Sequence, residues 1–314
     1  MHSRRRAHKV VRAVQALALP WRPTADVLIT IDPETSLAAF LATRGRAAWV
    51  ADVHEDYASL LRDRAWVPMP LLKVLQGAVR LLTRLIARAD LVLVADEHVP
   101  PGVARSRYVM RNEPDFSLLP EPGEMSDEAP WRAIYIGDNR ETRGLRTMVE
   151  AVAATSGDEE PWTLDLVGPV ADTDRDWLAE RLTQPDARRI TSHGRQEPLR
   201  AWRVAEGADV GLCLLADTPA FVEAMPSKVY EYQACGLPTI ATPLPRVADL
   251  IRRTGAGTLV RDVPETTEAL RRFATDPQWR AGLRAAAKKA AVASRAGHNT
   301  YDEAAARILE LVHR

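Results

Sequence analysis

Short apolar runs alternate with longer amphipathic segments along most of the chain. The runs have the length of β-strands and are almost continuously apolar, at 25–31 (ADVLITI), 47–53 (AAWVADV), 91–95 (LVLVA) and 107–111 (RYVMR). Such runs are typical of parallel strands that helices cover on both faces. Segments with helical periodicity lie between them, as in PLLKVLQGAVRLLTRLIARA. The pattern predicts an α/β fold made of alternating strands and helices.

The alternation stops at 118–130 and then resumes. The intervening LLPEPGEMSDEAP is rich in proline and acidic residues and has no periodicity, which predicts a linker. Further strand-length runs follow at 132–137, 162–168, 189–194, 209–215 and 257–260. We therefore expect two Rossmann-like domains, over 1–117 and 131–292, followed by a helix over 293–314.

Composition narrows the class of protein. The 314 residues leave room for two domains, and the formal net charge of zero gives no overall field that favours nucleic acid. No apolar stretch is long enough to cross a bilayer. Cys213 and Cys235 form neither a metal-binding spacing nor a disulfide framework, which favours a reducing compartment.

The first residues, MHSRRRAHKVVRAVQALALPW, are basic and partly apolar. Three interpretations are open: an export signal, a basic amphipathic helix that contacts anionic lipid, and a surface helix of a soluble domain. Arg12 and Gln15 interrupt the apolar part and no convincing cleavage site follows, which weighs against export.

The stretch 221–243, FVEAMPSKVYEYQACGLPTIATP, is a candidate ligand site. Pro226 and Ser227 predict the start of a short helix, with the Ser227 hydroxyl as a cap, and Gly236 with the following proline predicts its end. The helix N-terminus attracts anions, and Lys228 adds a full positive charge there.

Two glutamates flank that cation. Glu231 lies on the same helix face as Lys228, and Glu223 lies in the preceding loop, so both can accept hydrogen bonds from hydroxyl groups. A phosphate beside sugar hydroxyls suits a nucleotide sugar. From spacing alone, a short surface helix with an incidental Lys–Glu pair is an equally good interpretation.

Glu223 and Glu231 enclose seven residues that contain Pro-Ser-Lys, and Ala-x-Gly-x-Pro follows. The arrangement resembles the donor-site motif of GT4-type (glycosyltransferase group 1) retaining glycosyltransferases with the GT-B fold. Further likenesses are the glycine-rich first turn at 135–151, the His-Gly loop at 193–196, the Ala-Asp-x-Gly strand at 206–215, and the Asp-Pro-Glu and Asp-x-His-Glu-x-Tyr elements within 26–57. The resemblance covers most of the chain from about residue 25.

The resemblance implies a GT-B architecture, in which two Rossmann-like domains with parallel sheets face each other across a cleft. The 293–314 helix would cross back to the first domain. The implied activity is metal-independent, retaining transfer of a hexose from a nucleotide-diphosphate sugar to an acceptor hydroxyl. Its partners would be the nucleotide sugar and a glycan or lipid-linked acceptor, without another cofactor. The implied location is cytoplasmic, with peripheral contact to the inner face of the membrane through the basic N-terminus.

The resemblance also assigns roles to residues. Glu231 would bind the nucleotide ribose and Glu223 the hydroxyls of the transferred sugar, while Lys228 neutralises the diphosphate that leaves. Asp138 stands where many members have an arginine, so Arg140 or Arg143 would supply the second cation. His54 would lie near the reacting sugar carbon. The implied catalytic residues are His54, Glu223, Lys228 and Arg143, and the implied donor-binding residues are Gly137, Arg143, Ser227, Lys228, Glu231 and Arg195, with no metal ligand.

One part of the family pattern is missing. Nothing before Ala25 has the pattern of the usual first strand and glycine-rich turn, so we expect an N-terminal domain that is reduced or truncated. An alternative function is therefore a degenerate member that binds a nucleotide sugar or a partner without turnover. A third candidate, a sugar-nucleotide epimerase, would need an acid/base constellation that the sequence does not show.

Overall fold

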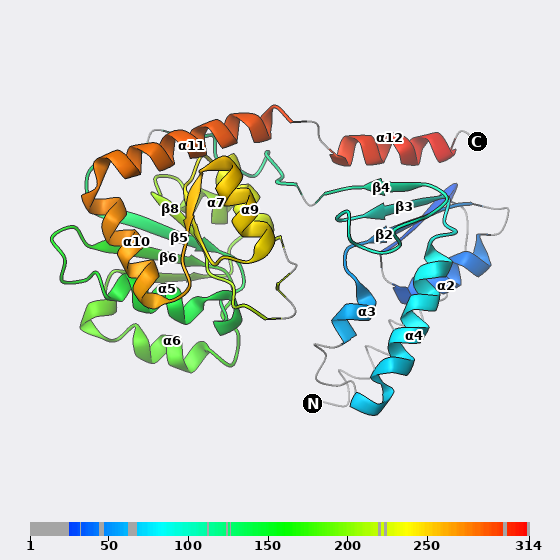
Figure 1. Ribbon diagram of the computed structural model, residues 1–314, viewed down its shortest axis with the longest axis horizontal. Helices are drawn as coiled ribbons and strands as arrows, with labels where there is room; N and C mark the ends of the chain where they lie inside the picture. The colour runs from blue at the N-terminus through cyan, green and yellow to red at the C-terminus, as the bar shows by residue number, and fades with distance from the viewer. Residues whose placement is uncertain are drawn as a thin grey trace. The chain divides into compact units, whose positions relative to one another are not determined.

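The computed structural model describes residues 25–31, 33–43, 47–61, 68–111, 113–123, 125, 127–218, 221–222, 225–297 and 300–312. The chain divides into two compact units, unit 1 with Met1–Asn112 and His298–Arg314, and unit 2 with Glu113–Gly297 (Figure 1). Each unit has a parallel sheet, which confirms the predicted α/β fold.

The sheet of unit 1 has four strands that pair in sequence order. They are β1 (Val27–Thr30), β2 (Ala48–Val53), β3 (Leu91–Val94) and β4 (Arg107–Val109), and all three pairs are parallel. Its helices are α2 (Pro33–Ala42), α3 (Tyr57–Leu60), α4 (Met69–Ile86) and α12 (Thr300–Val312).

Helices cover both faces of this sheet. Strand β2 therefore buries both sets of its alternating side chains. Trp49 belongs to a core with Ala39 of α2 and Ile86 of α4. Val50 belongs to a second core, which includes Ala304 of α12. The C-terminal helix therefore completes unit 1, although it follows unit 2 in the sequence (Figure 1).

The sheet of unit 2 has six parallel strands in the order β10-β9-β8-β5-β6-β7. Read from the other edge, this is the doubly wound order 3-2-1-4-5-6. The strands are β5 (Trp131–Ile136), β6 (Trp162–Val167), β7 (Ile190–Gly194), β8 (Val210–Cys213), β9 (Thr239–Ala241) and β10 (Gly257–Leu259).

Helices also cover both faces of the second sheet. They are α5 (Leu145–Ala153), α6 (Arg175–Arg181), α7 (Pro198–Val204), α8 (Ser227–Ala234), α9 (Pro245–Thr254), α10 (Val263–Thr275) and α11 (Pro277–Arg295), with short 3-10 helices η3 (Glu141–Arg143) and η4 (Pro185–Ala187). One core contains Trp131, Trp162 and Phe273, whose rings meet edge-on or tilted. The opposite core contains Trp202 of α7 and Tyr232 of α8.

The segment 118–130, for which a linker is expected, lies in unit 2. Leu119 is buried in the core formed by α7 and α8, and Nη1 of Arg295 lies 2.7 Å from Oε1 of Glu121. Among the described residues, no helix is both long and apolar enough to cross a membrane. The export and lipid-contact hypotheses for the first 24 residues fall outside the described part of the chain.

Candidate functional site

The candidate residues of unit 2 meet where its sheet reverses its strand order. Strand β5 connects to β6 on one side, whereas its neighbour on the other side is β8. Gly137 directly follows β5, and α8 is the first helix after β8. Ligands of doubly wound folds bind outside the carboxyl ends of the strands at this point, so the topology places these two segments at a binding position.

Lys228 is the second residue of α8, and only 6% of it is exposed. Its Nζ lies 5.0 Å from the centroid of the Tyr135 ring, over the ring face, which favours a cation. Burial lowers the pKa of Lys228, and the nearby Arg143 lowers it further. No described residue forms a salt bridge with this ammonium.

Arg143, at the end of η3, brings a second cation to Tyr135. Burial raises the pKa of Tyr135 to about 12, although the charge of Arg143 opposes this shift. The Nε of Arg143 is buried and has no hydrogen-bond partner among the described residues. Arg140 forms a salt bridge with Asp138. Of the two arginines considered from sequence, Arg143 is therefore the one that approaches Lys228.

Glu231 lies one helical turn after Lys228. Burial raises the pKa of its carboxyl group, while Lys228 and a hydrogen bond with Ser227 lower it. The prediction that Ser227 caps the helix is wrong, because the N-cap position is Pro226 and no side chain caps it. The first-turn N–H groups of α8 therefore have no side-chain cap, at the positive end of the helix dipole.

Close packing between β5 and α8 sets the position of Lys228. Gly137 has φ +155°, and a Cβ atom there would lie 3.2 Å from Nζ of Lys228, so glycine leaves room for the ammonium. The Tyr232 hydroxyl accepts a hydrogen bond of 3.1 Å from the backbone N–H of Ile136, which ties α8 to β5.

Sequence reasoning missed both Tyr135 and Tyr232. Tyr135 lies two residues before Gly137, so the alternation of a strand places both on the same face of β5. Tyr232 directly follows Glu231 in the motif. These two positions beside motif residues could have suggested both tyrosines from sequence. Spacing alone does not reveal that each tyrosine reaches a residue about a hundred positions away in sequence.

Two other predicted residues, His54 and Arg195, belong to other elements of the chain. His54 follows β2 in unit 1, has a half-exposed side chain, and places Nε2 3.0 Å from Oδ2 of Asp52. We call Gly137, Arg143, Ser227, Lys228 and Glu231 the Lys228 group. Arg195 is exposed directly after β7 and forms no hydrogen bond or salt bridge with this group. Glu223 lies outside the described residues. The described residues that meet are Gly137, Arg143, Ser227, Lys228 and Glu231.

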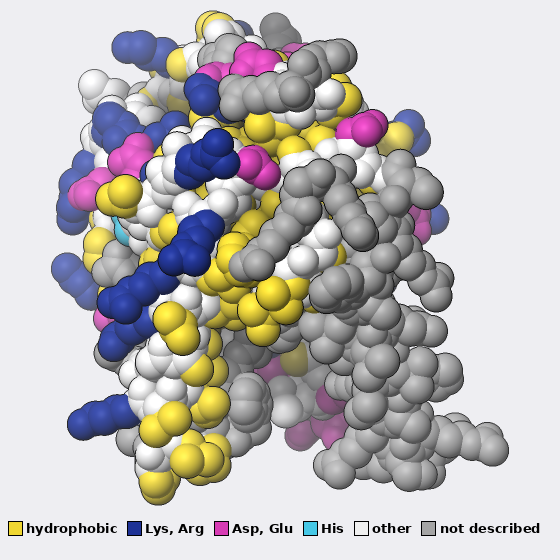
Figure 2. All heavy atoms as spheres, turned by 90° about the vertical axis from the view of Figure 1, so that its right-hand side faces the viewer, with side chains coloured by type: hydrophobic (Ala, Val, Ile, Leu, Met, Phe, Trp, Pro, Cys, Tyr) yellow, Lys and Arg dark blue, Asp and Glu magenta, His cyan; other side chains and the backbone are white. Residues whose placement is uncertain are grey.

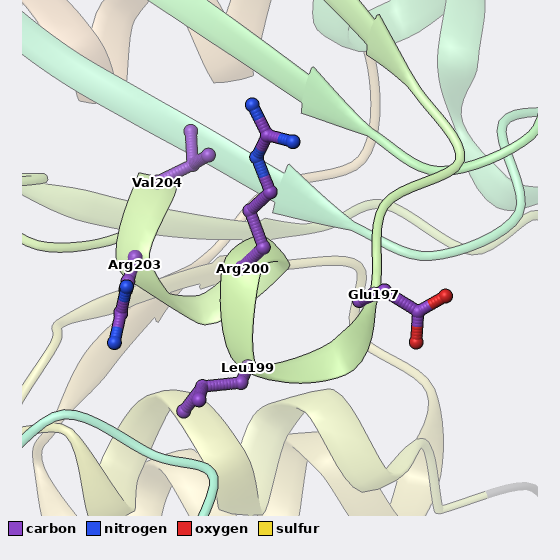
Figure 3. A pocket seen from close by; sticks show the side chains of 5 residues that line it. All are labelled: Glu197, Leu199, Arg200, Arg203 and Val204. Carbon is purple, nitrogen blue, oxygen red and sulfur yellow. The ribbon is translucent and has the colours of Figure 1, made fainter.

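Two hollows lie in unit 2. One hollow, of about 660 Å³, lies along the carboxyl edge of the sheet, between η3 and the loops after β8, β9 and β10. Its walls include Glu141, Asp217 and Thr242. The other lies over α7, where Figure 3 shows Glu197 and Arg203 pointing away from each other. The residues around the α7 hollow do not include any of the Lys228 group.

No group of three or more His, Cys, Asp or Glu side chains that could hold a metal ion occurs in the described residues. Both cysteines are buried free thiols: burial raises the pKa of Cys213 to about 11 and that of Cys235 to about 12. Around Lys228, the polar groups described are two cations, the Glu231 carboxylate and the backbone N–H groups of α8.

Comparisons with known proteins give a family match for most of unit 2. Residues 131–276 match the family model described as glycosyl transferases group 1. No curated protein sequence matches the chain. The matched range spans β5 to α10 and thus the whole sheet of unit 2.

Solved structures of similar fold cover most of the chain. HepE from Anabaena in complex with UDP has a TM-score of 0.69 at 15% identity, over 95% of this chain and 81% of that one. Sucrose-phosphate synthase from Thermosynechococcus elongatus has a TM-score of 0.63 at 16% identity, and the match covers 91% of this chain and 73% of that one. An E. coli structure described as trehalose-6-phosphate bound with UDP-2-fluoro glucose has a TM-score of 0.62 at 14% identity. The match covers 97% of this chain and 77% of that one.

At these identities the likeness to solved structures establishes the fold, whereas the family match covers residues 131–276 of unit 2. It confirms the resemblance that the motif around Lys228 indicated. Unit 1 has the smaller sheet of the two. Residues 131–276 therefore resemble the glycosyl transferases group 1 family, in a chain that has the GT-B fold.

Proposed function

We propose that this chain transfers a hexose from a nucleotide-diphosphate sugar to an acceptor hydroxyl, with retention at the anomeric carbon and without a metal ion. One observation carries the proposal: Lys228 and Arg143 lie close together at the topological switch point, and neither forms a salt bridge with a described residue. Two neighbouring cations without a salt-bridge partner among the described residues suit a dianionic ligand.

Each residue of the group has a role in this reaction. Lys228, Arg143 and the first-turn N–H groups of α8 stabilise the diphosphate as its negative charge develops. Glu231 accepts hydrogen bonds from the ribose hydroxyls. Gly137 leaves room for the phosphate to approach the backbone, and Ser227 orients Glu231.

The remaining residues complete the proposal. Glu223 binds the hydroxyls of the transferred sugar, Arg195 binds the nucleotide, and His54 lies near the reacting carbon. The acceptor oxygen forms a bond to the anomeric carbon, and the bond from that carbon to the phosphate oxygen breaks with its electron pair. The proton of the acceptor hydroxyl leaves with the nucleoside diphosphate.

The neighbouring structures support the choice of a first ligand. HepE was solved with UDP, and also with UDP and glucose. UDP is therefore the probe for the donor site, and UDP-glucose is the first donor to assay. We also propose a glycan or lipid-linked acceptor, a cytoplasmic location, and peripheral contact of the basic N-terminus with anionic membrane.

Thermal unfolding with UDP tests the donor site. We expect UDP to raise the unfolding temperature, and Glu231→Ala to weaken UDP binding by about tenfold or more, because it removes a charged hydrogen-bond acceptor. Glu268→Ala, at an exposed position of α10, is the matched control and should bind UDP like the unchanged protein. Equal UDP affinity for Glu231→Ala and the control would refute this site.

Turnover is a separate question from binding. Release of UDP from UDP-glucose that depends on an added acceptor would establish transfer. If UDP binds, but no nucleotide sugar in a panel releases its diphosphate with any acceptor, the chain is the degenerate binding protein instead.

A further inference from the structure

Helix α4 of unit 1 has an apolar strip that faces solvent. Leu71, Val74 and Leu81 are 51%, 68% and 66% exposed. Their spacing of three and seven residues places them along one side of the helix. The opposite side is buried, with Ile86 in the core beside β2. More than half of each of these side chains therefore lies outside the packing of unit 1.

A strip of cations runs beside the apolar one. Exposed cations are Lys73, Arg80 and Arg84, and their spacing of seven and four residues places them on one side of the helix. Arg88 is also exposed and lies just beyond the end of α4. None of them forms a salt bridge with another described residue. Figure 2 shows dark blue and yellow groups next to each other toward the lower left of this side of the unit.

The absence of counter-ions distinguishes these cations from others in unit 1. Arg105 forms a salt bridge with Asp90, and Arg111 forms one with Glu97. Between residues 71 and 88 the chain contains no acidic residue, and none of the exposed side chains there has an amide or hydroxyl group. The face thus offers positive charge and apolar surface, without the polar groups that would select a particular protein partner.

We propose that α4 docks on an anionic lipid surface. An amphipathic helix lies in the membrane interface when apolar side chains enter the boundary of the acyl chains and cations meet the anionic headgroups. The exposed strips of α4 are adjacent and parallel, so both can contact one flat surface. The proposal rests on unit 1 and is independent of sugar transfer by unit 2.

Vesicle sedimentation with the full chain tests the proposal. We expect binding to vesicles of equal phosphatidylglycerol and phosphatidylcholine, little binding to pure phosphatidylcholine, and weaker binding as salt rises. The double variant Arg80→Gln/Arg84→Gln should bind about thirty times more weakly, because two headgroup contacts are lost. Val74→Ser/Leu81→Ser should bind about ten times more weakly or worse.

Two controls make the test specific to α4. Lys288→Gln/Lys289→Gln removes the same charge from exposed positions of α11 and should bind normally. Arg4→Gln/Arg5→Gln/Arg6→Gln tests the basic N-terminus. The proposal is overturned if anionic vesicles bind no more protein than neutral ones, or if the α4 variants bind like the α11 control.

A second copy of this chain as the partner would give a different result. In that case the chain would self-associate in gel filtration, and Val74→Ser/Leu81→Ser would restore the monomer without a change in vesicle binding. That outcome would also overturn the proposal. Circular dichroism of each variant checks that loss of binding is not loss of folding.

Discussion

Lys228 carries its charge where burial disfavours it. Burial is the largest cause of its lowered pKa, and Arg143 adds repulsion, while Glu231 and the Tyr135 ring favour the cation. The free protein therefore has a local electrostatic cost that a bound diphosphate would remove. Binding sites commonly contain such costs, and mutations there can raise stability while they abolish function.

The variant Lys228→Met should separate stability from binding. Methionine has a similar length without the charge, so we expect the unfolding temperature of the free protein to rise and the shift caused by UDP to disappear. Differential scanning calorimetry with and without UDP measures both. Lys289→Met, exposed on α11, should change neither quantity. A Lys228→Met protein that keeps the full UDP shift would show that this ammonium does not contact the diphosphate.

The pKa of Lys228 also predicts a pH dependence. Its folded value lies below the ordinary 10.5, so between the two values the unfolded chain binds more protons and the contribution of Lys228 to stability rises with pH. A bound diphosphate favours the cation and raises this pKa. In that alkaline window we therefore expect UDP binding to take up a proton and to weaken as pH rises.

Calorimetric titration of UDP in two buffers of different ionisation enthalpy measures the uptake. Lys228→Met should lose the part of the uptake that belongs to the protein. An uptake that is the same in both proteins would assign the proton to UDP alone.

The contact between α8 and β5 holds the site together at the level of elements. Tyr232 accepts a hydrogen bond from Ile136, and its ring packs over Gly211 of β8 so closely that a Cβ atom there would overlap the ring. The position of Lys228 thus depends on a glycine in the neighbouring strand. A side chain at 211 would have to move the helix that carries the cation.

Two glycine substitutions test this dependence. Gly211→Ala should lower the unfolding free energy by about 1–3 kcal/mol and weaken UDP binding, because it overpacks a full core. Gly282→Ala is the matched change in α11, where a Cβ atom meets nothing within 4 Å, and it should stabilise the protein by about 0.5–1 kcal/mol. Urea denaturation compares the two. Unchanged stability in Gly211→Ala would contradict the close packing under Tyr232.

Sequence predicted the strands well and the site in part. Each run named above contains a strand. The reason is clearest for β3 and β8, which are buried at every position and therefore lack polar side chains. Lys228, Glu231 and Gly137 were predicted from local motif residues. The Tyr135 and Tyr232 contacts, the pair between Arg140 and Asp138, and the absence of a cap at Ser227 depend on backbone direction and on residues distant in sequence, which spacing does not encode.

The whole molecule consists of one continuous and one discontinuous unit. Unit 2 runs from Glu113 to Gly297 without interruption and contains its own cores, whereas unit 1 needs Ala304 of α12 to cover Val50 and Leu93. The proposed donor site and the α4 face thus belong to units whose integrity depends on different parts of the chain.

A fragment of residues 113–297 should therefore fold alone and bind UDP as tightly as the full chain. The complementary deletion of 298–314 should destabilise unit 1, because it exposes the apolar face of β2 and β3, and should leave the UDP shift intact. Calorimetry and UDP titration of both proteins measure these outcomes. Failure of the fragment to bind UDP would show that unit 1 contributes to donor binding.

The return of α12 to unit 1 affects the order of folding during synthesis. Domains generally fold from the N-terminus as the chain is made. Here the four strands of unit 1 are made first, but the helix that covers one face of their sheet is made only after all of unit 2. Unit 2 can therefore reach its final state earlier. During that interval the growing chain exposes the apolar side chains of Val50, Leu91 and Leu93, which gives a chaperone a defined surface to protect.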